Sequence, residues 1–218
     1  MEIGATKAVQ DRLKTTKIEE SKGASLVFCW DTHLTKIKGR NVLFIVNASN
    51  RYTIAMTDIE QGNWKYYTMY ISRVIHVVMQ EMGYSEDQIR KYFKMSGDAT
   101  VTKTHGRKSV GGINRMVMDA QYFGKKLEKE AKYQWELSEY LNRDICQPEG
   151  FDTYGYPSEL FKLDMERLGI AAKRKPAKII DFTKYIDTNR STNHCTKELL
   201  KQLFGHKKLV CNDEKQDV

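Results

Sequence analysis

The segment Asn-Val-Leu-Phe-Ile-Val-Asn, residues 41–47, decides the fold class of this chain. Its five central residues are all apolar, and β-branched and aromatic side chains are enriched in strands. An apolar run without alternation is typical of a strand that is buried on both faces. We therefore predict a central strand here, with a covering layer on each side of its sheet.

Two further extended runs flank this segment, at 26–37 and 52–58, while the central run extends to residue 48. Gly39 lies in the first break between them, and residues 47–50 (Asn-Ala-Ser-Asn) form the second. Glycine and asparagine favour the tight turns that join adjacent strands. The three runs therefore predict a small antiparallel β-meander, preceded by a short N-terminal strand and helix.

Helical periodicity follows the meander. Apolar side chains recur at three-and-four spacing over 64–82, where Gly83 ends the pattern, and Ser85 is placed to cap a second helix. Residues 99–104 resemble one more strand, after which Ser109 is placed to cap a long helix. We predict an α+β fold, with a core domain at 1–170 and a basic, partly helical C-terminal extension at 171–218 that includes a short helix at 196–204.

The chain has 218 residues and a formal net charge of +8, and the charge is unevenly distributed. Residues 103–132 contain 8 Lys and Arg against 3 Asp and Glu, a net +5, and residues 171–218 contain 11 against 6, also +5. Residues 133–170 contain 3 against 8, a net −5. Clustered positive charge favours a phosphate-bearing partner, although a solvated mixed surface explains the same pattern.

The compartment and the cofactor class follow from what the sequence lacks. The four cysteines form no Cys-x-x-Cys pair, and no His, Cys, Asp or Glu cluster has metal-ligand spacing, so we predict no metal and no cofactor. No apolar run approaches the length of a membrane helix, and the first residues are charged. We expect a cytoplasmic protein that does not engage a membrane.

The best candidate site is the strand, loop and helix start at 102–115. Gly106 permits close approach, and a helix N-terminus presents free N–H groups and a positive dipole end to an anion. The Gly-x4-Gly-Lys-Ser/Thr spacing of a nucleotide-hydrolysing loop is absent. The predicted phosphate-binding or nucleic-acid-binding residues of this segment are Lys103, His105, Arg107, Lys108, Ser109, Asn114 and Arg115.

Residues outside this segment complete the predicted site. Arg51 follows the central strand, and Lys173, Arg174 and Lys175 form a short basic run that resembles a phosphate-contacting arm. His33 and His105 are candidates for a two-histidine acid/base site, which would require both imidazoles within hydrogen-bond reach of a scissile group. A structural role for each histidine is the simpler alternative.

The chain resembles a bacterial, phage and plasmid family catalogued as a domain of unknown function, number sixty-nine thirty-three, over about residues 1–165. Members often have Cys-Thr-Lys where this chain has Ala5-Thr6-Lys7, and Lys108 is inserted between Arg107 and Ser109. The resemblance implies an α+β fold and an origin in mobile elements, and it implies no activity. The matching pieces are Thr6-Lys7, Trp30, His33-Leu34, 42–47, Arg51-Tyr52, Lys103-Thr104, Arg107, Ser109-Val110 and Asn114.

Three functional hypotheses remain open. The first is a non-enzymatic phosphate-recognising protein that binds nucleic acid or a nucleotide and serves a phage or plasmid against host defence. The second is an inhibitor that docks on a host protein, such as a nucleic-acid-processing defence enzyme, through the acidic 133–170 segment or the basic tail. The third is a metal-independent RNase or transferase that uses His33 and His105.

Overall fold

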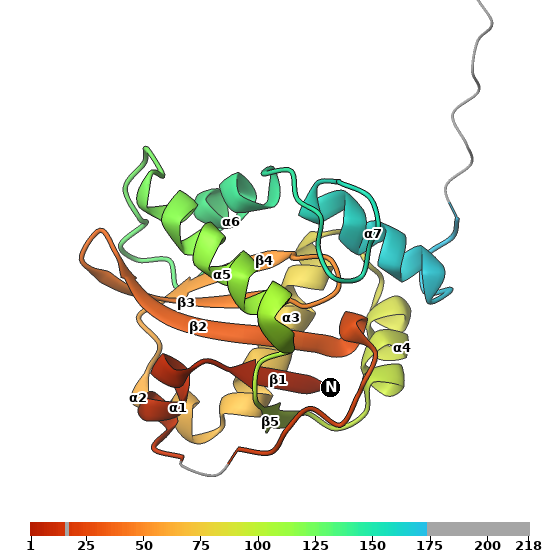
Figure 1. Cartoon of the computed structure of the whole chain (residues 1–218), viewed down its shortest axis with the longest axis horizontal. Helices are drawn as coiled ribbons and strands as arrows, with labels where there is room; N and C mark the ends of the chain where they lie inside the picture. Colours follow the sequence, from red (N-terminus) through yellow and green to blue (C-terminus); the bar gives the residue numbers. More distant parts are fainter. Residues whose placement is uncertain (16–17, 174–218) are drawn as a thin grey trace, which may run out of the picture. The chain divides into compact units, whose positions relative to one another are not determined.

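The computed structural model describes residues 1–15 and 18–173 and confirms an α+β fold. Its five-stranded mixed sheet has the order β4-β3-β2-β1-β5 (Figure 1). The predicted meander is present, because β3 pairs antiparallel with both β2 and β4. The predicted N-terminal strand and the predicted strand at 99–104 extend this meander into a mixed sheet, since β1 pairs in parallel with β2 and with β5. The strands are β1 Glu2–Ala5, β2 Cys29–Ile37, β3 Arg40–Asn47, β4 Thr53–Thr57 and β5 Thr100–Thr102.

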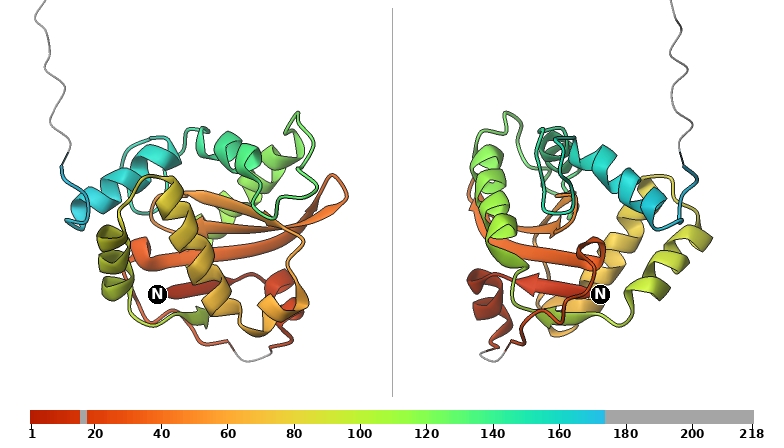
Figure 2. Two further views of the ribbon diagram at one scale, coloured as in Figure 1. Left: turned by 180° about the vertical axis from the view of Figure 1, so that it is seen from behind. Right: turned by 45° about the vertical axis from the view of Figure 1, so that its right-hand side comes forward.

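The sheet is covered on both faces, as the apolar central strand requires. Val42 and Phe44 of β3 pack with α5 (Gly106–Gln121) and α6 (Trp135–Asn142) in one core. Leu43 and Ile45 point to the opposite face and pack in a second core with α3, α4 and α7. The bounds of these three helices are Tyr67–Glu81, Glu86–Ser96 and Pro157–Arg167. The arrangement is a three-layer α/sheet/α architecture, visible from behind and in the turned view of Figure 2.

The local helix signals are largely confirmed. Ser85 caps α4 in a reciprocal capping box with Gln88, and Gly83 has a φ of +86° just after α3. The predicted helix over 64–82 is divided at Tyr66 into α2 (Gln61–Lys65) and α3. Two short elements complete the described part of the chain, α1 (Lys7–Leu13) and a 3₁₀ turn at Leu26–Phe28.

The start of α5 differs from the prediction. The helix begins at Gly106 with His105 as its N-cap residue, so Ser109 lies inside the first turn and is not the cap. The Ser109 hydroxyl instead donates to the carboxylate of Asp31, a residue of β2. The carboxylate that accepts hydrogen bonds at this helix start therefore comes from a distant strand, which a local capping signal cannot reveal.

The outer edge of β4 is bonded to α6 and the segment before it. Asn142 accepts a hydrogen bond from the Thr53 N–H (2.8 Å) and donates one to the Thr53 carbonyl (2.7 Å). The Ala55 N–H donates to the Ser138 hydroxyl (3.0 Å), and the Ala55 carbonyl accepts from the Gln134 N–H (2.9 Å). These bonds fix α6 against the sheet.

The predicted C-terminal extension, 171–218, lies outside the described residues from residue 174 onward, and so does its expected helix at 196–204. Within 1–15 and 18–173, no helix combines the length and the apolar character that crossing a bilayer requires.

Candidate functional site

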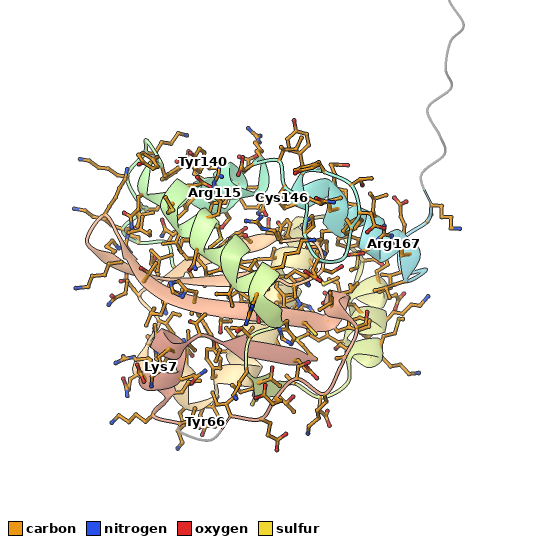
Figure 3. The ribbon with its side chains drawn as sticks, in the orientation of Figure 1. Lys7, Tyr66, Arg115, Tyr140, Cys146 and Arg167 are labelled. Carbon is orange, nitrogen blue, oxygen red and sulfur yellow. The ribbon has the colours of Figure 1, made fainter. Side chains whose placement is uncertain are left out.

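A basic hollow of about 240 Å³ lies alongside the first half of α5. Three cationic side chains from two parts of the chain line it: Arg51 from the β3–β4 turn, and Lys108 and Arg115 from α5. Figure 3 labels Arg115 on this helix. The other lining residues are Ala48, Ser109, Gly111, Gly112, Gln147, Pro148 and Glu149. The structure thus brings Arg51 together with three of the residues predicted from the 102–115 segment.

Backbone geometry places Arg51 in the basic hollow. Arg51 has a left-handed φ of +62°, and its Nη2 donates to the Gly112 carbonyl at 2.7 Å. A Cβ at Gly112 would lie 2.9 Å from Nε of Arg51, so the absence of a side chain there permits this close approach. A guanidinium carries five N–H donors. Further donors of Arg51 are therefore available to an anion.

The cations of α5 are held only weakly. Lys108 donates to the Pro148 carbonyl at 3.3 Å and lies 4.0 Å from a carboxylate oxygen of Glu149. Arg115 forms an (i, i+4) pair with Asp119 at 3.3 Å. Exposed ion pairs contribute little, typically about 0–1 kcal/mol. Both cations can therefore exchange these partners for a ligand at small cost.

Arg107 and Asn114 are also exposed on α5, outside the lining of the basic hollow. Arg107 precedes Lys108 in the first turn, where the helix dipole is positive. Its position extends the positive surface beyond the basic hollow toward the helix start.

Beneath the helix start is a buried polar cluster, which consists of Glu2, Asp31, His105 and Ser109. The His105 ring lies between two carboxylates, with Nδ1 at 2.7 Å from Asp31 Oδ1 and Nε2 at 3.0 Å from Glu2 Oε2. The backbone N–H of His105 also donates to Asp31, at 3.2 Å. The side chains of Asp31 and His105 are 0% and 3% exposed. Asp31 therefore occupies part of the anion-binding position that the sequence assigned to a phosphate.

The electrostatics of the cluster keep His105 protonated. Burial lowers the pKa of His105, but hydrogen bonds to Asp31 and Cys29 and the nearby negative charge outweigh it and raise the pKa to about 10. Burial raises the pKa of Glu2, but hydrogen bonds from Ser21 and His105 outweigh it, so this pKa is lowered. An imidazolium with both nitrogens engaged and almost no exposure is a poor acid or base near neutral pH.

His33 has a different environment. Its Nδ1 lies 3.2 Å from the Thr6 hydroxyl, and burial lowers its pKa. On β2 it pairs with Phe44, whereas Arg51 follows the end of β3 and bonds to α5. The geometry thus gives His33 and His105 separate partners and does not favour a joint acid/base site.

The remaining predicted cations are dispersed. Lys103 is paired with Glu20 on the surface. Lys173 is exposed, and Arg174 and Lys175 lie outside the described residues.

Comparison with known protein families assigns this domain to one of them. The model of one family, described as Domain of unknown function (DUF6933), matches residues 2–160. The chain belongs to this family. The matched range includes all five strands of the DUF6933 domain, the buried polar cluster and the basic hollow. No curated protein and no solved structure matches the chain.

Several residues of the DUF6933 site carried no signal in the sequence. Glu2 and Asp31 are isolated acidic residues in the sequence, and 74 positions separate Asp31 from its partner His105. Gly112 resembles an ordinary helix residue. Gln147, Pro148 and Glu149, which also line the basic hollow, form no recognisable binding motif. One available signal was the placement of Asp31 between Trp30 and Thr32 in a strand, where a charged residue requires a partner.

Proposed function

We propose that the basic hollow recognises a phosphate group of a nucleic acid or nucleotide, without catalysing a reaction. The observation that carries this proposal is the convergence of Arg51, Lys108 and Arg115 on one concavity, with a single carboxylate, Glu149, in its lining. Guanidinium groups bind phosphate through paired, charge-assisted hydrogen bonds, and lysine adds a point charge.

The size and surroundings of the basic hollow narrow the ligand class. Drug-sized ligands occupy pockets of about 300–1,000 Å³. A hollow of about 240 Å³ fits a phosphate with its attached sugar better than a complete dinucleotide. Arg107, exposed in the first turn of α5, adds a cation beside it. This arrangement suits a backbone phosphate with a neighbouring phosphate on the adjacent surface.

The test is a salt-titrated binding assay of the full chain against labelled single-stranded and duplex DNA and RNA. Linear and cyclic mononucleotides and inorganic phosphate serve as competitors. Log affinity should fall linearly with log salt, because each neutralised phosphate releases counterions. Competition by a mononucleotide would assign the binding to the hollow, whereas competition by none of the small molecules would indicate a surface that reads the polymer backbone.

The decisive variant is Arg107→Ala/Lys108→Ala. We expect weaker binding and a salt slope reduced by about 1 for each phosphate contact removed. The matched control is Arg73→Ala/Lys94→Ala, which removes the same charge from exposed positions of α3 and α4 in the opposite layer. Equal affinity and slope in the first variant and the wild-type protein, with both folded, would remove the proposal.

A second candidate function is protein binding beside α6. A hollow of about 430 Å³ there is lined by charged side chains of both signs: Asp119, Glu136, Glu139, Asp144, Lys125 and Arg143. Tyr140 in its lining is 43% exposed, and the nearby Tyr122 is 80% exposed. Aromatic residues are enriched at protein interfaces. If this surface docks an inhibited enzyme, Tyr122→Ser/Tyr140→Ser should abolish capture of that partner and leave nucleic-acid binding unchanged.

A further inference from the structure

Three side chains with metal-ligating atoms meet beneath the start of α5. Glu2 comes from β1, Cys29 from the first position of β2 and His105 from the residue before α5. Their ligand atoms all lie within 4.8 Å of one another. Glu2 and Cys29 are buried, at 4% and 0% exposure, and the His105 side chain is 3% exposed. His105 follows Glu2 by 103 positions in the sequence, which is why no ligand spacing is visible there.

The surroundings of these atoms resemble the supporting shell of a metal centre. Nδ1 of His105 is bonded to Asp31 at 2.7 Å, which leaves Nε2 directed at Glu2. Metal-ligating histidines almost always bond their second ring nitrogen to a carboxylate, a carbonyl or water in this way. Glu2 is itself oriented, because it accepts hydrogen bonds from the Ser21 hydroxyl (2.6 Å) and from the Lys22 N–H (2.8 Å).

The charge balance of the site also favours a cation. Two buried carboxylates, Glu2 and Asp31, face one imidazole. Buried charges in proteins are generally paired or coordinate a metal. A divalent ion bound by Glu2 and His105 would add positive charge beside both carboxylates.

We propose that Glu2, Cys29 and His105 form a zinc-binding site in which Asp31 positions the histidine ring. A donor set of nitrogen, sulfur and carboxylate oxygen suits Zn²⁺, whereas Mg²⁺ and Ca²⁺ prefer oxygen ligands throughout. Binding replaces the hydrogen on the Cys29 sulfur and the proton between His105 and Glu2, and both protons go to solvent. Three protein ligands leave a fourth position on the ion.

This inference stands apart from the proposed function, but the two sites are neighbours in the fold. The three ligands belong to β1, β2 and the residue that precedes α5. A bound ion would therefore join two strands of the sheet to the helix that carries Lys108 and Arg115.

The test uses Co²⁺, which replaces zinc and reports thiolate ligation by a near-ultraviolet charge-transfer absorption. The full chain is dialysed against a chelator and then titrated with Co²⁺, and bound Co²⁺ is displaced with Zn²⁺. We expect the absorption to saturate at a single equivalent in Cys146→Ser/Cys195→Ser/Cys211→Ser, in which Cys29 is the sole thiol. Zn²⁺ should abolish it and should raise the melting temperature of the wild-type protein.

Cys29→Ser should lose the absorption, while the matched variant of the other described buried thiol, Cys146→Ser, should keep it. Asp31→Asn should weaken metal affinity by about 10–100-fold, as expected for a residue that supports a ligand. A folded wild-type protein without the absorption, or an absorption that persists in Cys29→Ser, would overturn the proposal. If Cys29→Ser fails to fold, the variant with Cys29 as its sole thiol still identifies the sulfur ligand.

Discussion

Gly4→Ala tests the buried polar cluster through a single methyl group. Gly4 is paired with Asp31 in the parallel register of β1 and β2. A Cβ at Gly4 would collide with Oδ1 of Asp31 and would lie 3.0 Å from the Thr104 Cα. The Asp31 carboxylate would have to leave its position, and its bonds to His105 and Ser109 would break.

The expected magnitude follows from the burial of these groups. Separating a buried, hydrogen-bonded ion pair costs about 3–5 kcal/mol. Replacing glycine by alanine offsets about 0.5–1 kcal/mol of this, because the unfolded chain loses conformational freedom. The free energy of unfolding should therefore fall by about 2–4 kcal/mol, out of a total of about 5–15 kcal/mol for a typical domain.

The assay is urea unfolding in the presence of a chelator, followed by tryptophan fluorescence and circular dichroism. Gly111→Ala is the matched control, because a Cβ there meets nothing within 4 Å and the residue lies inside α5. That variant should gain about 0.5–1 kcal/mol. If the free energy of unfolding of Gly4→Ala fell by less than about 1 kcal/mol, the buried polar cluster would not stabilise the fold as argued.

Three further predictions concern separate parts of the fold. Burial lowers the pKa of His33 below its ordinary value of 6.5, so the unfolded state takes up the proton first as the pH falls. Stability should decrease as the pH falls below about 6.5, and His33→Gln should reduce this decrease between pH 7.5 and pH 5 in urea unfolding. Asn142→Ala leaves the buried N–H and carbonyl of Thr53 without their side-chain partner. Each of these two unpaired groups should lower the free energy of unfolding by about 1–3 kcal/mol, and faster amide hydrogen exchange at Thr53 would verify the loss of the first bond. Ser85→Ala should lower thermal stability by the equivalent of about 1 kcal/mol, because it removes the hydroxyl that accepts a hydrogen bond from the Gln88 backbone N–H. Ser85→Gly should cost only a few tenths of a kcal/mol, and equal losses in the two variants would contradict this reason.

The sequence predicts those parts of the fold that neighbouring residues determine. The meander follows from the apolar 41–47 segment and its flanking turns, and α4 follows from Ser85 and Gln88. The parallel pairing of β1 is not predictable in this way. Glu2 and Gly4 are poor strand formers, and their place in the sheet depends on partners far along the chain.

The candidate site likewise combines features that neighbouring residues determine with contacts between residues far apart in the sequence. The positive charge of the α5 start follows from adjacent residues in the sequence. Arg51, a separate phosphate-binding prediction, lies with Lys108, Ser109 and Arg115 in the lining of the basic hollow, and phosphate binding by this group stays a prediction. The sequence did not show that Asp31 would occupy the helix start, because that contact spans 78 positions. A buried ion pair assembled from three elements leaves no local pattern.

The bonds between β4 and α6 also bear on how this protein meets other molecules. An edge strand with free N–H and carbonyl groups is a template for strand addition by another chain, and hence for aggregation. Along β4, the outward groups of Thr53 and Ala55 already have partners in α6 and the segment before it. Another polypeptide therefore cannot extend the sheet through these groups without first displacing α6, and a partner on this side has to recognise side chains instead of the exposed backbone of a strand.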